Sequence, residues 1–223
     1  MFIKYDGKKN ILLNEPTIKD IEQAMNSSAE RIKVLSDGKI FLEQDFVHTI
    51  IRSGARVFRI ESRFVDKTGF KAMENILFSS YKNKSGQVKK AYVEAAIQVT
   101  PINLRNMGNI VRRICDINVD RVIFKVVNKE KMLTTTNDLK LMIDYCERQD
   151  KWSLTENIPL CIMDNYEYHV SEIYPHNSKK ENKREECKDC FYKKECPGFE
   201  GMNVFPKKDG KPINQMQLDY QTK

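Results

Sequence analysis

The most constraining feature of this sequence is a fivefold alternation between short apolar segments and amphipathic segments. The apolar segments have the length and composition of β-strands, and in each following segment apolar residues recur every three or four positions, as on one helix face. The predicted strands are residues 10–16, 31–38, 55–62, 93–100 and 120–127, and the predicted helices are 17–30, 43–54, 66–82, 103–118 and 134–149. Thr17 has the side chain of an N-cap, and Gly54 follows the second helix. The alternation predicts an α/β fold with a parallel sheet and crossover helices, either doubly wound or curled toward a barrel.

The loops that leave the carboxyl ends of the strands are the expected place for a ligand in such folds. These loops contain the sequences "NEPT", "SDG", "ESR" and "TPIN" and the stretch after Val127. We therefore expect the binding residues of this chain to lie in these loops.

The length of 223 residues is enough for one domain of ordinary size with a small appendix. Because the alternation ends near residue 150, we divide the chain into an α/β domain at 1–150, a Cys-rich appendix at 151–205 and a polar tail at 206–223. Residues 157–175 are predicted as a short hairpin.

The charge of the chain suggests a partner but does not single one out. A formal net charge of +7 is typical of proteins that bind nucleic acid. Basic residues are nevertheless interleaved with acidic ones, as in "KKENKREECKDC", which favours a solvated surface over a nucleic-acid site. The sequence has no run of about 18 apolar residues and no apolar run near Met1. We therefore expect a cytoplasmic protein without a membrane span or signal peptide.

Four cysteines in the appendix indicate a metal site. Cys187 and Cys190 form a C-x2-C pair, whose spacing lets two thiolates reach one ion, and Cys196 follows just before a Pro-Gly turn. Cys161, after the apolar "NIPL", completes a set of four. Four thiolates suit a tetrahedral zinc ion or a 4Fe–4S cluster, and the spacing alone does not choose between them.

The remaining cysteines and the nearby histidines receive other interpretations. Cys115 and Cys146 fall on the apolar faces of predicted helices and are expected to be small buried hydrophobic residues. His169 and His176 could replace Cys161 in a Cys3His zinc site, but both are predicted to lie on the surface.

The order of these motifs resembles the radical S-adenosylmethionine (radical SAM) superfamily, specifically members with a SPASM- or twitch-like auxiliary cluster. The matching segments are "LLNEPTIKDIEQA", similar to the GGEP strand and helix of that family, then "IKVLSDG", "RVFRIES", "IQVTPIN", "PLCIMDN" and "CKDCFYKKECPG". Together they span residues 11–201. The resemblance implies a partial (β/α) TIM-like barrel that lacks its first unit, followed by an appendix carrying a 4Fe–4S cluster.

The resemblance also implies binding residues for S-adenosylmethionine. Glu15 takes the position that meets the amino group of the cofactor, and Ser62 lies where the family contacts its ribose or carboxylate. Thr100 and Asn103 flank the same pocket. The alternative for Glu15 is an acidic residue that stabilises a helix start, and for the other three it is capping at strand ends. Auxiliary clusters in this family commonly serve peptide or protein modification, which implies a peptide or protein substrate.

The sequence departs from the family in two motifs, of which the first is decisive. It contains no C-x3-C-x2-C, and no cysteine precedes Cys115. Leu13 and Asn14 stand where the family has the two glycines of GGEP. We therefore expect a truncated or degenerate homologue that does not cleave S-adenosylmethionine alone, with no catalytic residue assigned and a partner chain as one source of the absent unit. The alternative is a non-catalytic zinc-binding α/β module that contacts nucleic acid or a protein partner.

Overall fold

The computed structural model of this chain describes residues 3–5, 10–26, 31–62, 67–82, 86–127 and 132–171, together with Tyr192 and Cys196. These residues form one seven-stranded sheet and five α-helices. The sheet strands are β1 (Ile3–Tyr5), β2 (Asn10–Asn14), β3 (Arg31–Ser36), β4 (Ala55–Ser62), β7 (Tyr92–Val99), β8 (Arg121–Val126) and β9 (Trp152–Glu156). The α-helices are α1 (Ile18–Asn26), α2 (Gln44–Arg52), α3 (Lys67–Phe78), α4 (Pro101–Asp116) and α5 (Met132–Arg148).

Smaller elements complete the described part of the chain. β5 (Ser80–Lys82) and β6 (Val88–Lys90) form a separate antiparallel hairpin. Three short 3-10 helices are η1 (Lys39–Phe41), η2 (Leu160–Ile162) and η3 (Glu167–His169). None of the described helices is long and apolar enough to cross a membrane.

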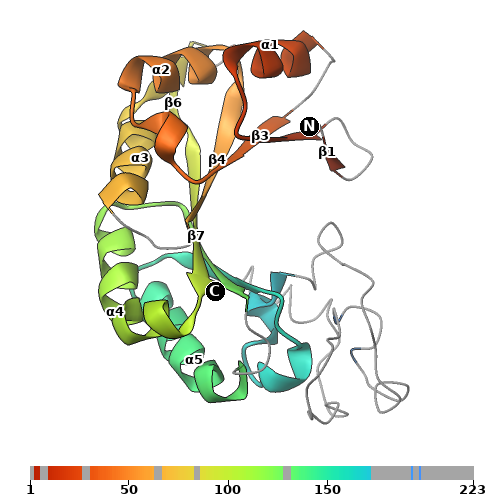
Figure 1. Cartoon of the computed structure of the whole chain (residues 1–223), viewed down its shortest axis with the longest axis vertical. Helices are drawn as coiled ribbons and strands as arrows, with labels where there is room; N and C mark the ends of the chain where they lie inside the picture. Colours follow the sequence, from red (N-terminus) through yellow and green to blue (C-terminus); the bar gives the residue numbers. More distant parts are fainter. Residues whose placement is uncertain are drawn as a thin grey trace.

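The sheet is wound in one direction. Its order is β1-β2-β3-β4-β7-β8-β9, with β1 antiparallel and the other six strands parallel. Because the parallel strands follow chain order without reversal, right-handed crossovers place every helix on the same face. Figure 1 shows α1 to α5 along one side of the sheet. Of the two arrangements predicted, the described residues therefore do not adopt the doubly wound one.

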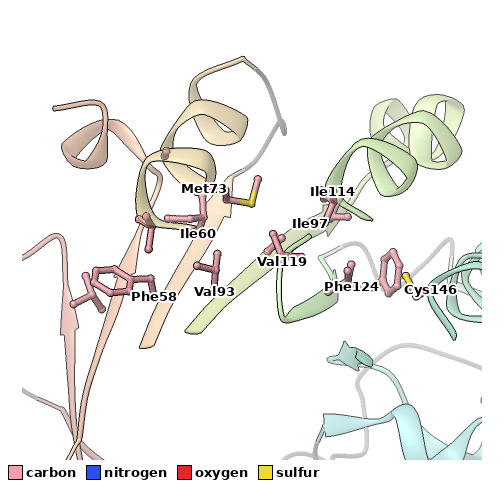
Figure 2. Close-up of a cluster of buried hydrophobic side chains, with 14 of the residues drawn as sticks. Phe58, Ile60, Met73, Val93, Ile97, Ile114, Val119, Phe124 and Cys146 are labelled. Atoms are coloured by element: carbon pink, nitrogen blue, oxygen red, sulfur yellow. The ribbon is translucent and has the colours of Figure 1, made fainter. Parts of the chain in front are cut away.

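The hydrophobic core lies between the sheet and this helical layer. Every second residue of a strand points toward the helices, as expected for the period of two. Figure 2 shows Phe58 and Val93 of the sheet with Met73 of α3, Ile114 of α4 and Cys146 of α5. All five are buried, with at most 1% of each residue exposed. The predicted burial of Cys115 and Cys146 is confirmed.

Local signals at the helix ends agree with the structure. The Thr17 hydroxyl accepts a hydrogen bond from the Asp20 N–H at 3.3 Å, and the Asp20 carboxylate accepts one from the Thr17 N–H at 2.7 Å. This reciprocal arrangement satisfies two backbone donors at the start of α1. Gly54, after α2, has a φ of 119°, a left-handed value that favours glycine.

Two features beyond residue 150 differ from the sequence-based prediction. Residues 152–156 form β9, which pairs with β8 and extends the sheet past the point where we ended the first domain. The hairpin predicted at 157–175 is wrong over its described part, because residues 160–162 and 167–169 are 3-10 helices. A single bridge, between Thr155 and Val170, attaches this segment to β9.

Candidate functional site

The face of the sheet opposite the helices carries charged side chains from five parallel strands. Across β4, β7 and β8, Arg59, Glu94 and Arg121 lie side by side in register. The ion-paired residues described on this face, here called the charged face, are Lys33, Arg59, Glu61, Glu94, Arg121, Lys125 and Glu156. In an all-parallel sheet covered on both sides, such positions are normally apolar. Charged residues at alternate strand positions therefore indicate that this face of the sheet is not covered by a second apolar layer.

The strongest contact on the charged face joins two strands that are not neighbours. Both terminal nitrogens of Arg59, on β4, donate to the two carboxylate oxygens of Glu156, on β9, at 2.6 Å each. β7 and β8 lie between them, a separation of about 14 Å in a flat sheet. A bidentate bond over that span requires the two side chains to lean across the face, which a sheet concave on this side makes easier.

Glu61 links this pair to a lysine near the carboxyl ends of the strands. The Glu61 carboxylate lies 3.6 Å from Arg59 Nε and accepts a hydrogen bond from Lys125 Nζ. Glu61 and Lys125 are each one residue from the end of their strands, and Glu156 is the last residue of β9. This end of a parallel sheet is where (β/α) enzymes place their active sites.

A second group of charges lies toward the opposite end of the strands. Glu94, of which 2% is exposed, forms ion pairs with Lys33 at 2.5 Å and Arg121 at 3.0 Å. The Arg121 guanidinium lies 5.5 Å from the ring centroids of both Tyr92 and Trp152. Since Tyr92, Arg121 and Trp152 each begin a strand, this group closes the end of the sheet associated with stability rather than chemistry.

Contacts on the charged face keep Arg59 and Glu156 ionised despite their burial. Burial alone would lower the pKa of Arg59, but its bonds to Glu156 and the charges of Glu61 and Glu94 outweigh it and raise the pKa. Burial alone would raise the pKa of Glu156, but hydrogen bonds from Arg59 and the charges of Arg59, Lys125 and Lys33 outweigh it and lower the pKa. Both side chains therefore stay charged at neutral pH.

Glu15, predicted to bind S-adenosylmethionine, lies directly after β2 and organises the loop after β3. Its carboxylate accepts hydrogen bonds from the Ser36 hydroxyl at 2.9 Å and the Asp37 N–H at 2.6 Å. The Ser36 hydroxyl in turn accepts one from the Gly38 N–H at 2.9 Å. Glu15 has a φ of 44°, a strained value for a residue with a side chain. A role in loop structure therefore exists whether or not a cofactor binds.

The other three predicted cofactor residues lie at the same edge of the sheet, on neighbouring elements. Ser62 ends β4 opposite Ile97 of β7, and its side chain lies outside the described residues. The Thr100 hydroxyl caps α4 by accepting from the Asn103 N–H at 3.1 Å. The buried Asn103 amide donates to the Gln98 carbonyl at 2.6 Å. Capping accounts for Thr100, and cofactor binding by all three stays a prediction.

Two of the four predicted metal ligands are described. Cys161 lies in η2, and both it and Cys196 are partly buried against the main hydrophobic core. Tyr192, which is fully buried in that core, accepts a backbone hydrogen bond from the Cys196 N–H at 2.8 Å. The cysteine-rich segment is therefore packed on the α/β domain at these residues. Cys187 and Cys190 lie outside the described residues, and the described ones alone contain no cluster of three metal-ligating side chains.

His169 was predicted to lie on the surface, and this prediction is wrong. The imidazole is buried, with Nδ1 2.8 Å from the Ser153 carbonyl oxygen and Nε2 3.3 Å from the Glu147 carboxylate. Burial lowers the pKa of His169 despite these partners. Tyr166 donates to Asp144 at 2.7 Å and thereby attaches the same segment to α5. His176 lies outside the described residues.

Sequence reasoning missed the charged face, although a signal was present. "VFRIES" and "VIFKVV" each place a charged residue between apolar neighbours in a strand of a predicted parallel sheet. This period of two indicates that one face of the strand avoids the apolar core. In comparisons with known proteins, no family model and no curated protein matches the chain.

Proposed function

We propose that this chain is a radical-SAM-like protein that carries an auxiliary 4Fe–4S cluster and acts in the modification of a peptide or protein. As it stands, without a C-x3-C-x2-C, it does not cleave S-adenosylmethionine alone. The observation that carries the proposal is the charged face of a singly wound parallel sheet. A partial (β/α) barrel requires a singly wound parallel sheet with helices only on its outer face. An inner face that is not closed into a barrel core can carry charged side chains, as this one does.

The contact between Arg59 and Glu156 supports the barrel part of the proposal. It joins β4 to β9 over two intervening strands, and closure into a barrel needs curvature toward the side on which these residues lie. Basic and acidic groups at the carboxyl ends of the strands also offer a polypeptide partners of both signs. The peptide part of the proposal rests on this charge and on the family resemblance.

The cluster part of the proposal rests on the thiols. Cys161 and Cys196 are partly exposed and stand on the packed domain, so they fit ligands of a group bound at the domain surface. With Cys187 and Cys190 they supply the four thiolates that a 4Fe–4S cluster takes. When bound, such a cluster supplies one-electron redox chemistry. Tyr192 anchors this segment in the core next to Cys196.

Anaerobic purification of the full chain tests the cluster. We expect a broad brown absorbance and roughly four iron and four sulfide ions per chain. Cys187→Ser and Cys190→Ser should each lose most of the iron. Cys115→Ser, in the packed helical layer, is the matched control and should keep it. Colourless protein with about one zinc ion per chain overturns the cluster and favours the zinc-binding alternative.

Calorimetric titration with S-adenosylmethionine tests the cofactor separately. We expect heat of binding that Glu15→Ala reduces or abolishes. If the titration gives no heat, and wild type and variant are indistinguishable, cofactor binding fails while the cluster proposal stands. Circular dichroism of both proteins excludes misfolding as the cause.

A further inference from the structure

Two of the predicted metal ligands come from separate segments of the chain and rest on the same hydrophobic core. Cys161 and Cys196 are both partly buried and both pack against the core between the sheet and the helical layer. Their thiols are free. Cys146, by contrast, has no exposed surface and only fills the core. Thiols at the surface of a packed domain fit ligands of a thiophilic metal group.

The backbone around Cys161 is fixed by its immediate neighbours. Cys161 is the middle residue of η2, and the residues on either side of it, Leu160 and Ile162, are buried. The Ile162 N–H donates to the Pro159 carbonyl at 3.2 Å, and the Met163 N–H donates to the Leu160 carbonyl at 3.1 Å. Cys161 is therefore carried by a short turn whose flanking side chains are inserted in the core.

Cys196 is held in a different way, through a single inserted ring. The Tyr192 side chain belongs to the main core and is among the largest fully buried side chains of the described residues. The Cys196 N–H donates to the Tyr192 carbonyl at 2.8 Å, a spacing of four positions that forms one α-turn. An aromatic side chain buries roughly 150–250 Å², so insertion of Tyr192 fixes this turn firmly. The turn in turn brings Cys196 to the surface of the core.

Tyr192 belongs to the ligand segment itself. In the sequence it lies between Cys190 and Cys196, both predicted to bind the metal group. Withdrawal of the ring from the core would therefore move the segment that supplies these ligands. Thiolates that must converge on one metal group tolerate little such movement, because metal–sulfur distances are short and fixed at about 2.3 Å.

We propose that Tyr192 is a positioning residue of the metal site, and that its insertion in the core is energetically linked to binding of a thiophilic metal group by the four cysteines. The linkage is reciprocal: a bound group stabilises the inserted ring, and loss of the ring weakens retention of the group. Residues that orient ligands without touching the metal typically change its affinity by about 10–100-fold. The inference rests on the four-cysteine site of the proposed function, and it holds for zinc as for a 4Fe–4S cluster.

Metal retention by the full chain tests one direction of the linkage. Anaerobically purified protein is incubated with EDTA for a fixed time, and iron and zinc are then counted per chain. Tyr192→Ala should retain several-fold less metal than wild type, although all four cysteines remain, and Tyr192→Phe should retain most of it because the ring is kept. Phe41, fully buried with its ring centroid 5.5 Å from that of Phe58, provides the matched control.

The control separates positioning from loss of stability. Phe41→Ala also removes a buried aromatic ring from the core but should keep its metal. Metal loss by Phe41→Ala equal to that of Tyr192→Ala, or full retention by Tyr192→Ala, overturns the inference and leaves the metal site standing. A wild type that contains neither iron nor zinc overturns the four-cysteine site, and with it both the proposed function and this inference.

Hydrogen exchange of the wild type tests the other direction and needs no variant. The Cys196 amide is hydrogen-bonded to Tyr192, so peptides that contain it should exchange slowly in the metal-loaded protein. After the metal is removed they should exchange many-fold faster, whereas peptides from β4 should keep their protection. Protection of the Cys196 amide that survives metal removal overturns the linkage, whatever the variants show.

Discussion

Replacing Glu156 by Gln removes the charged partner of Arg59 while keeping the shape of the side chain. Arg59 and Glu156 have 12% and 21% of their side chains exposed. Removing one member of a fully buried ion pair lowers the free energy of unfolding by about 3–5 kcal/mol. Because Glu61 remains 3.6 Å from Arg59, we expect Glu156→Gln to lose about 3 kcal/mol. For a chain of this size, that loss lowers the melting temperature by about 6–12 °C.

A double-mutant cycle isolates the pair. Arg59→Met and Glu156→Met should each cost about 3 kcal/mol, whereas the double variant should cost no more than either, since two apolar side chains leave no unpaired buried charge. Urea unfolding reports the free energy, and the single tryptophan, Trp152 on the same strand as Glu156, provides the fluorescence signal. Strictly additive effects, or a loss below about 0.5 kcal/mol for Glu156→Gln, would refute the role given to this pair.

The exposed pair of Lys71 and Glu74, 3.9 Å apart on α3, is the matched control. Lys71→Met should change stability by less than about 0.5 kcal/mol.

The pH dependence of stability gives an independent check on the pair of Arg59 and Glu156. Because the folded pKa of Glu156 lies below its ordinary value of 4.5, its stabilisation is present above that pH and is lost as the pH falls through the folded pKa. Glu156→Gln should weaken this acid-induced loss.

Three further predictions concern single residues. The pKa of His169 is lowered from 6.5, so the folded state favours the neutral imidazole even though the Glu147 carboxylate faces the ring. The free energy of unfolding should therefore fall as the pH drops below 6.5, by at most about 1.4 kcal/mol per pH unit. His169→Gln should flatten that slope in urea titrations between pH 5 and 7.5. Glu15→Ala should lose about 1–2 kcal/mol with its bond to Ser36, and Glu15→Gly should lose less, because glycine accepts the positive φ. Thr100→Ala removes the N-cap of α4 and should lower stability by about 1 kcal/mol in thermal unfolding. Thr100→Ser keeps a hydroxyl at the cap position and should retain most of that stability.

The five strand–helix units were predictable because their signals are local. Each helix repeats apolar residues at a period that its own sequence displays, and Thr17 and Gly54 mark helix ends through their own backbone chemistry. β9 was missed because "WSLTE" is short and, within the described residues, is followed by 3-10 turns rather than by an α-helix. Its place in the sheet comes from pairing with β8.

Contacts between distant residues could not be predicted. Arg59 and Glu156 are 97 positions apart, and nothing near either one in the sequence selects the other. The burial of His169 depends on Ser153 and Glu147, which come from a strand and a helix that hydropathy does not bring together. The sequence could place charges on one face of a strand, but which of them meet follows from the winding and curvature of the sheet.

The charged face also bears on the choice between a polypeptide and nucleic acid as partner. A phosphate backbone is bound by basic groups that exchange counterions for phosphates, which requires positive charge not already neutralised. Among the described side chains of this face, each of the four basic ones has a carboxylate partner: Lys33 and Arg121 pair with Glu94, Arg59 with Glu156, and Lys125 with Glu61. A ligand that binds to this face must therefore break one of these ion pairs. It must then offer a negative group to the freed basic side chain and a positive group to the freed carboxylate. Groups of opposite sign on one molecule, as on a peptide, meet that requirement, whereas a run of phosphates leaves the displaced carboxylates unpaired.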